Sequence, residues 1–178
     1  MEQKVVKPLV PYQFYTFQNC IGESSVTWHA GSMHKAMDLA KIQDYNITTY
    51  SSIMPAKAEQ VSKIPDYPMG THLEGIIASI NGYRGELLAA GVAYNWLYAD
   101  EDLTQCVGGI VVERTGNYTS ETLELELDKS LREIKNFSYS NLFWDTDNAT
   151  YLKSVFTPEE TYGTAYAGLV FINYLEIE

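Results

Sequence analysis

The sequence contains few cysteines, few basic residues and no long apolar run. Two cysteines in 178 residues, Cys20 and Cys106, are too few for a disulfide framework and predict two free thiols in a reducing cytoplasm. Twelve basic side chains stand against 23 acidic ones, and this net charge of -11 disfavours nucleic acid and anionic membranes as partners. No segment reaches the roughly 18 apolar residues of a membrane span, and the first residues lack an apolar run of signal-peptide length. We therefore expect a cytoplasmic protein.

Tyrosine, by contrast, is abundant. The chain has 14 tyrosines, and aromatic side chains suit the half-buried surface of a pleated sheet. At 178 residues, the chain is most simply one domain, residues 1–178, with enough length to bury a core. We find no internal repeat and no composition shift that marks a domain boundary.

The hydrophobic pattern predicts a mixture of helices and strands that are segregated rather than alternating. One helix is expected over 32–41, and another from Thr119 or Ser120, with a buried stripe of Leu123, Leu127, Leu131 and Ile134. Loops are expected at 22–25 and 56–70. Strands are expected at 46–50, 73–80, 87–98, 106–114, 141–144, 151–156 and 165–175. This order indicates an α+β fold with a largely antiparallel sheet.

Two familiar kinds of site are not supported by the spacing of the residues. Cys20, His29 and His34 lack the fourth ligand of a structural zinc site, so we predict no metal. Gly108-Gly109 lies inside an expected strand and opens no helix, which excludes a dinucleotide fingerprint.

One short stretch is unusual: "TYSSIMP", residues 49–55, where an expected strand ends on two serines followed by an apolar pair and a proline. Two adjacent serines alone would indicate a loop. Their neighbours change the interpretation, because "AKIQDYNITTYSSIMPAKAE" resembles the cleavage region of the pyruvoyl-dependent arginine decarboxylases, a self-processing family of archaea and chlamydia-like bacteria. "CVGGIVVERTG", residues 106–116, is similar to the family's strand that carries an essential glutamate, and "YGTAYAGLVFINYL" to its terminal core strand.

The resemblance implies a role for each matching residue. Ser52 would become a covalent pyruvoyl group, and cleavage between Ser51 and Ser52 would give a β subunit, residues 1–51, and an α subunit, residues 52–178. Asn46 matches the asparagine that supports processing, and Glu113 matches the catalytic proton donor. The family packs two sheets between outer helices, an αββα-type sandwich, and assembles as trimers or hexamers with active sites between protomers.

The chemistry requires these residue types. The Ser52 hydroxyl attacks the Ser51 carbonyl and forms an ester, with Asn46 available to donate to the developing oxyanion and a strained bend before Pro55 assisting. β-Elimination gives dehydroalanine, which hydrates and loses ammonia to leave the pyruvoyl ketone. This ketone forms a Schiff base with the substrate α-amine and accepts the electrons released with CO2. A protonated Glu113 then returns a proton to Cα, unless it is simply a strand-end carboxylate paired with Arg114.

The sequence departs from the family at the substrate site. Counting back from Ser51-Ser52, the family's aspartate, which holds the substrate guanidinium, is replaced by His34. An imidazole is a poor partner for a guanidinium, although Asp38, one helical turn further on, can take over this role. The candidate substrate-binding residues are therefore His34, Asp38, Ile53 and Met54.

Three functions remain open at this point. The first is decarboxylation of arginine to agmatine, in polyamine synthesis or acid resistance. The second is the same chemistry on lysine, ornithine or histidine. The third is a non-catalytic, uncleaved, sheet-rich binding or assembly protein.

Overall fold

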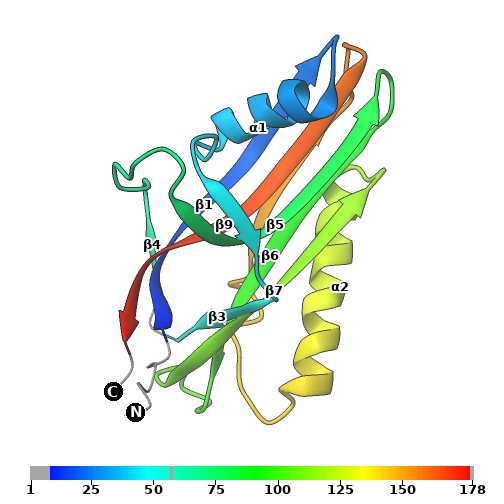
Figure 1. The fold of residues 1–178 in the computed structure, drawn as a ribbon. Helices are drawn as coiled ribbons and strands as arrows, with labels where there is room; N and C mark the ends of the chain where they lie inside the picture. The colour runs from blue at the N-terminus through cyan, green and yellow to red at the C-terminus, as the bar shows by residue number, and fades with distance from the viewer. Residues whose placement is uncertain (1–8, 57, 177–178) are drawn as a thin grey trace, which may run out of the picture.

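A computed structural model describes residues 9–56 and 58–176, and Figure 1 shows how its strands and helices are arranged. The strands are β1 (Leu9–Ser24), β2 (Asn46–Thr49), β3 (Ile53–Pro55), β4 (Glu59–Val61), β5 (His72–Tyr83), β6 (Leu88–Tyr98), β7 (Cys106–Gly116), β8 (Thr150–Phe156) and β9 (Tyr162–Glu176). The helical segments are the π-helix η1 (Trp28–Met33), α1 (His34–Leu39) and α2 (Ser120–Ser138). Within these residues, none of the helices is long and apolar enough to cross a membrane.

The strands form two sheets. A five-stranded sheet has the order β2-β5-β9-β1-β4, and a four-stranded sheet has the order β3-β7-β6-β8. Antiparallel pairing dominates, because only the two edge strands β2 and β4 lie parallel to their neighbours in the described part of the chain. β2 and β3, consecutive in sequence, are therefore edge strands of different sheets.

The layers follow from the alternation of side chains along each strand. On β6, Val92 and Tyr94 face the five-stranded sheet, whereas Ala93 and Leu97 face α2. The core between the sheets also contains Phe171 of β9. η1 and α1 cover the outer face of the five-stranded sheet, and α2 covers the outer face of the four-stranded sheet (Figure 1). The α+β sandwich with largely antiparallel sheets and outer helices is thus confirmed.

Helix α2 forms as its sequence predicts. The side chain of Thr119 caps the helix by accepting a hydrogen bond from the backbone N–H of Thr122. Leu123, Leu127 and Leu131 are fully buried against β6 and β7, and the helix begins one residue after its cap.

Several of the expected boundaries differ from the structure, and β1 was not among the expected strands. The expected strand at 141–144 is only an isolated bridge between Tyr98 and Phe143. Residues 22–24 belong to β1, because their pairing with β9 continues to Ser24. The connector 56–70 contains β4, which pairs with β1 over three residues. The first helix begins earlier than expected, as the π-helix η1.

Candidate active site

The chain passes from one sheet to the other across the Ser51-Ser52 bond. The backbone N–H of Tyr50 donates to Gly75 O at 2.7 Å, in the five-stranded sheet. Two residues later, Ser52 O accepts from the backbone N–H of Val111 at 2.9 Å, in the four-stranded sheet. Ser51 alone separates these two anchors, so the candidate cleavage site spans the open side of the sandwich, where β2 and β3 lie at the edges (Figure 1).

The pleat of the sheet brings Ser52 and Glu113 together. Met54 lies opposite Gly109 in the antiparallel pair β3–β7, and its side chain points between the sheets. Side chains alternate along a strand, so Ser52, Val111 and Glu113 face the same side as Met54. The Ser52 hydroxyl donates to Glu113 Oε2 at 3.2 Å. The structure therefore joins the two residues expected to carry the chemistry, which lie 61 positions apart in the sequence.

Gly109 allows this approach. A Cβ atom at this position would lie 3.2 Å from Trp96 Cε3 and 3.3 Å from Met54 Cβ, closer than most side chains tolerate. The glycine pair that was excluded as a nucleotide fingerprint thus has a structural role, since it makes room for β3 against β7.

The environment of Glu113 shifts the pKa of its carboxyl upwards. Glu113 lies opposite Val92 of β6. Its side chain is exposed at one side, but partial burial of the carboxyl raises its pKa above the usual range, although the hydrogen bond from Ser52 acts in the opposite direction. Arg114 points to the other face and donates to Ser130 of α2, so it is not the partner of Glu113. β7 also continues to Gly116, which places Glu113 within the strand rather than at its end.

The carbonyl group that Ser52 would attack is already hydrogen-bonded. The backbone N–H of Ile53 donates to Ser51 O at 2.9 Å and closes a three-residue turn centred on Ser52. The bend expected before Pro55 is therefore located at Ser52, and Pro55 itself lies in β3. In this geometry, the group placed to donate to an oxyanion that formed at Ser51 O would be the backbone amide of Ile53.

Asn46 lies at the other end of β2. Its side-chain amide donates to Gly70 O at 2.9 Å, and its backbone N–H donates to Thr71 O at 2.9 Å. Three residue steps along the strand, about 10 Å, separate it from Thr49. Within the described chain, Asn46 thus holds β2 in register with β5 and does not reach the Ser51 carbonyl.

His34 and Asp38 are also distant from Ser52 within one chain. Both are exposed on α1, where Asp38 lies 3.9 Å from the Nζ of Lys41. α1 lies over the upper part of the five-stranded sheet in Figure 1, whereas β3 lies near the bottom. The fold of a single copy therefore does not bring these two residues to the cleavage site.

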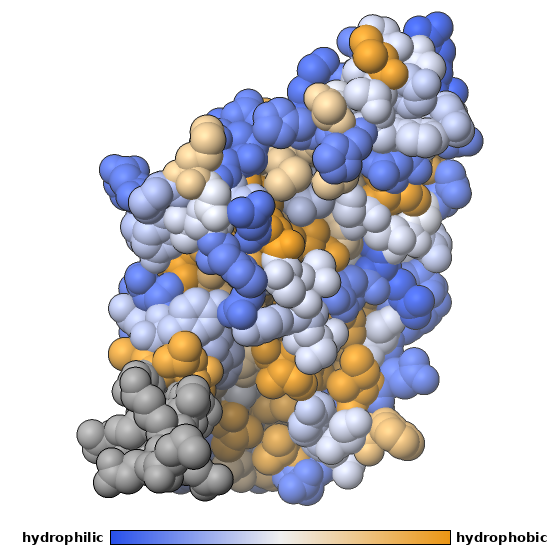
Figure 2. Space-filling model, viewed as in Figure 1, coloured by the Kyte–Doolittle hydropathy of each residue, from blue (hydrophilic) through white to orange (hydrophobic). Residues whose placement is uncertain are grey.

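The two residues after Ser52 have different environments. The side chain of Ile53 is 51% exposed, whereas Met54 is completely buried in the core between the sheets. Met54 therefore anchors β3, whereas Ile53 lies opposite Ile110, faces the other side of the strand and is open to solvent. Figure 2 shows the face of the molecule that is seen in Figure 1, where apolar surface lies among polar surface.

Sequence reasoning missed Tyr50, Glu74 and Tyr174, which gather beside the crossing segment. These residues, with Leu9 and His72, line a hollow of about 210 Å³. The alternation along β5 contained the signal, since Glu74 has the same parity as the buried Ile76 and must point between the sheets.

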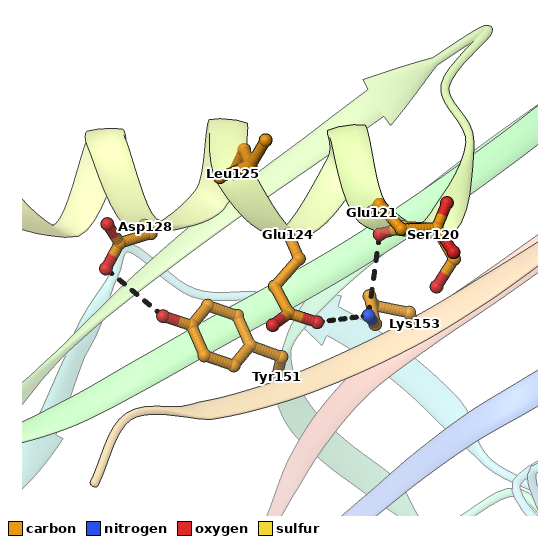
Figure 3. Close-up of a pocket in the computed structure, with 7 residues that line it drawn as sticks. All are labelled: Ser120, Glu121, Glu124, Leu125, Asp128, Tyr151 and Lys153. Atoms are coloured by element: carbon orange, nitrogen blue, oxygen red, sulfur yellow. Dashed lines mark hydrogen bonds and ion pairs between the residues drawn. The ribbon is translucent and has the colours of Figure 1, made fainter. Parts of the chain in front are cut away.

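A wider hollow of about 500 Å³ lies on the outer side of the four-stranded sheet, between α2 and β8 (Figure 3). Tyr151 donates to Asp128 Oδ1 at 3.2 Å, and Lys153 binds Glu124 and the carbonyl oxygen of Ser120. These contacts tie the helix to the edge strand. Ser52 and Glu113 face the opposite side of the same sheet, so this hollow is separate from the candidate active site.

The comparisons with known proteins identify a family. The family model of the pyruvoyl-dependent arginine decarboxylases matches residues 15–176, which include Ser51, Ser52 and Glu113 and all of both sheets except the first six residues of β1. No curated protein matches the sequence.

Proposed function

We propose that this chain, which belongs to the pyruvoyl-dependent arginine decarboxylase family, cleaves itself between Ser51 and Ser52 and decarboxylates arginine to agmatine. Membership of the family implies a decarboxylase that depends on a pyruvoyl group. The observation that carries the residue assignment is the 3.2 Å hydrogen bond between the Ser52 hydroxyl and Glu113, within a segment that crosses between sheets.

Self-cleavage starts with the Ser52 hydroxyl. Its oxygen attacks the Ser51 carbonyl carbon, the peptide C–N bond breaks, and the hydroxyl proton passes to the released amino group of Ser52. The N–H of Ile53 supports this step, because it already donates to the oxygen that becomes negative. Asn46 contributes indirectly in this proposal, by fixing the register of β2, which leads into the crossing.

The residues around Ser52 fit a pyruvoyl group derived from it. Loss of the ester by β-elimination, followed by addition of water and loss of ammonia, converts Ser52 without an external oxidant. The resulting ketone supplies an electrophile that holds the substrate α-amine and accepts the electrons released with CO2. Glu113, whose pKa is raised by burial, then supplies a proton to the substrate Cα.

The substrate carries a cationic side chain in this proposal, and arginine is its first choice because of the family. Asp38 is the candidate partner for the guanidinium, since His34 occupies the position of the family's aspartate. Lysine, ornithine and histidine remain the alternative substrates, because an imidazole at position 34 changes the charge that the site offers.

We also propose that the functional form is a trimer, or a pair of trimers, of cleaved protomers. The separation of α1 from Ser52 supports this proposal, since a neighbouring copy can supply His34 and Asp38 to the site. Exposed apolar side chains on α1 and β3, and before β5, also support it: Leu39, Ile53 and Met69.

Intact mass measurement of the purified protein tests the function. We expect two chains, residues 1–51 and 52–178, with the mass of the longer chain reporting a pyruvoyl N-terminus. Ser52→Ala should remain a single chain without decarboxylase activity. CO2 release from a panel of arginine, lysine, ornithine and histidine then identifies the substrate. A wild-type protein that remains whole and contains no ketone contradicts the proposal and leaves the non-catalytic alternative.

A further inference from the structure

Two contacts hold Tyr50, the residue before the two serines, against the five-stranded sheet. The N–H of Tyr50 is bonded to Gly75 O, and its ring packs against Phe171 with 6.1 Å between centroids. Both partners belong to the five-stranded sheet. The residues after the cleavage site are held by the other sheet, through Val111 and Glu113. The Ser51-Ser52 bond thus joins a residue that follows an anchor on the five-stranded sheet to a residue that is hydrogen-bonded to the four-stranded sheet.

A carboxylate provides a further anchor on the Tyr50 side. Glu74, beside Gly75, points into the space between the sheets and accepts a hydrogen bond from the hydroxyl of Tyr174. Glu74 lies beside the Tyr50 side chain in the same hollow, and this carboxylate, with a smaller contribution from burial, raises the pKa of Tyr50 to about 12. Tyr50, Glu74 and Tyr174 line one hollow beside the segment that crosses between the sheets.

We propose that Glu74, together with Tyr50 and Tyr174, acts as a positioning clamp for self-cleavage. The clamp fixes the Ser51 carbonyl relative to the Ser52 hydroxyl, and through this geometry it sets the rate at which the ester forms. Glu74 does not touch the reacting atoms and is not a catalytic residue. The inference rests on the proposed function, since a chain that does not cleave has no use for the clamp.

The physical reason is the sensitivity of intramolecular attack to alignment. A reaction between two groups of one chain is fast when the attacking atom is held near its target, and small misplacements cost about 100-fold. Val111 and Glu113 fix only one side of the bond. Without an anchor on Tyr50, the Ser51 carbonyl would rotate with the end of β2, which terminates at Thr49.

The experiment follows the appearance of the 1–51 and 52–178 chains with time, after synthesis of the full-length protein in a cell-free system. Tyr50→Phe keeps the ring on Phe171 but removes the hydroxyl, and Glu74→Ala removes the carboxylate. Both should slow cleavage about 10- to 100-fold. Glu74→Gln should restore most of the rate, because its amide oxygen still accepts the hydrogen bond from Tyr174 and keeps a polar group beside the side chain of Tyr50.

A second tyrosine–carboxylate pair gives matched controls. Tyr151 donates to Asp128 on the far side of the four-stranded sheet (Figure 3). Tyr151→Phe and Asp128→Ala remove the same kinds of groups and should leave the cleavage rate unchanged. Thermal unfolding of all variants separates a loss of stability from a loss of positioning.

Hydroxylamine, which cleaves an accumulated ester directly, identifies the affected step. If the clamp acts on ester formation, hydroxylamine will not restore cleavage of Glu74→Ala. Cleavage of Tyr50→Phe and Glu74→Ala at the wild-type rate overturns the clamp. If the KM of the cleaved Glu74→Ala protein for arginine also rises, Glu74 is assigned to substrate binding instead. A wild-type chain that stays whole overturns the proposed function, and the clamp with it.

Discussion

At the scale of single residues, the candidate site depends on environment more than on unusual chemistry. Serine and glutamate are common residues, and "SS" or "VVE" alone would indicate nothing. Ser52 becomes a candidate nucleophile because its carbonyl and its hydroxyl are both held by β7. Glu113 becomes a candidate acid because apolar neighbours on β6 and β7 disfavour its charged form.

Replacement of Glu113 should separate cleavage from decarboxylation. In Glu113→Gln, the amide oxygen still accepts the hydrogen bond from Ser52, so we expect the 1–51 and 52–178 chains to form. The amide cannot donate the catalytic proton as an acid does, so kcat should fall about 100- to 10,000-fold. Mass spectrometry and CO2 release measure the two effects, and a variant with undiminished kcat would remove Glu113 from the mechanism.

The pH dependence of kcat in the wild-type enzyme should reflect the ionisation of the Glu113 carboxyl. Burial raises the pKa of Glu113, so the active, protonated form persists to higher pH than for an exposed glutamate. We expect kcat to be highest on the acidic side of this pKa and to decline as pH rises through it. Measurement of kcat at saturating substrate from pH 4 to pH 9 checks the direction, and a rate that increases over this range would assign Glu113 the role of a base.

At the scale of elements, α2 and several strands of the inter-sheet core are predictable from the sequence, but β1, whose Phe14 lies in that core, was not among the expected strands. The cap at Thr119 and the leucines at 123, 127 and 131 define α2 through local rules alone. The pattern also located the strands at 46–49, 88–98 and 106–116 to within two residues.

What the sequence cannot predict is the pairing of distant elements. β4 is three residues long and begins with two polar residues, Glu59 and Gln60, and only its alignment with β1 makes it a strand. The contact between Ser52 and Glu113 requires the register of β3 against β7, and the family resemblance supplied their roles without that geometry. Tyr50 and Glu74 were missed for the same reason, because they meet only when β2 lies beside β5.

A core substitution in α2 should destabilise the protein without affecting the chemistry. Leu127 is fully buried, and its Cδ1 lies close to the space above Gly91 of β6. Leu127→Ala should lower the free energy of unfolding by about 2 to 5 kcal/mol. The residue faces away from Ser52, so the fraction of cleaved chain should equal that of the wild type. Urea unfolding and gel densitometry measure the two quantities, and impaired cleavage in a folded variant would show that α2 influences the site.

The five-stranded sheet should weaken at alkaline pH through Tyr166 of β9. Its ring stacks on Phe17, and burial raises its pKa to about 12. The unfolded chain loses this proton near pH 10, so stability is full below pH 10 and declines as pH rises towards 12, by up to about 3 kcal/mol. Tyr166→Phe removes this term. Denaturant unfolding of both proteins at pH 8 and pH 11 should show a smaller alkaline loss for the variant.

At the scale of the whole molecule, the proposed substrate residues and the proposed reacting residues lie apart. His34 and Asp38 lie on α1, and Ser52 and Glu113 lie at the edge of the other sheet. A site that needs both groups requires a second copy of the chain, so activity should depend on assembly.

Mixed assemblies test this dependence. Asp38→Lys and Glu113→Gln proteins should each be nearly inactive alone. When they are coexpressed, about a quarter of the sites should combine the intact α1 of one copy with the intact Glu113 of its neighbour and should recover activity. Ser52→Ala coexpressed with Glu113→Gln is the control. Both of these residues come from the same chain, so no activity should return. Failure of the first mixture would mean that each protomer holds a complete site.

The position of β1 affects how well the protein can refold after cleavage. The 1–51 fragment carries β1, which lies between β9 and β4, and also β2, which lies beside β5. The two polypeptides of the mature form would thus remain interleaved, with backbone hydrogen bonds in place of the severed peptide bond. Once unfolded, however, they would have to find each other by diffusion, and the intact precursor would no longer exist to guide them. Maturation would be irreversible: the enzyme would be assembled once, as a single chain, and could not be rebuilt with the same efficiency from its parts.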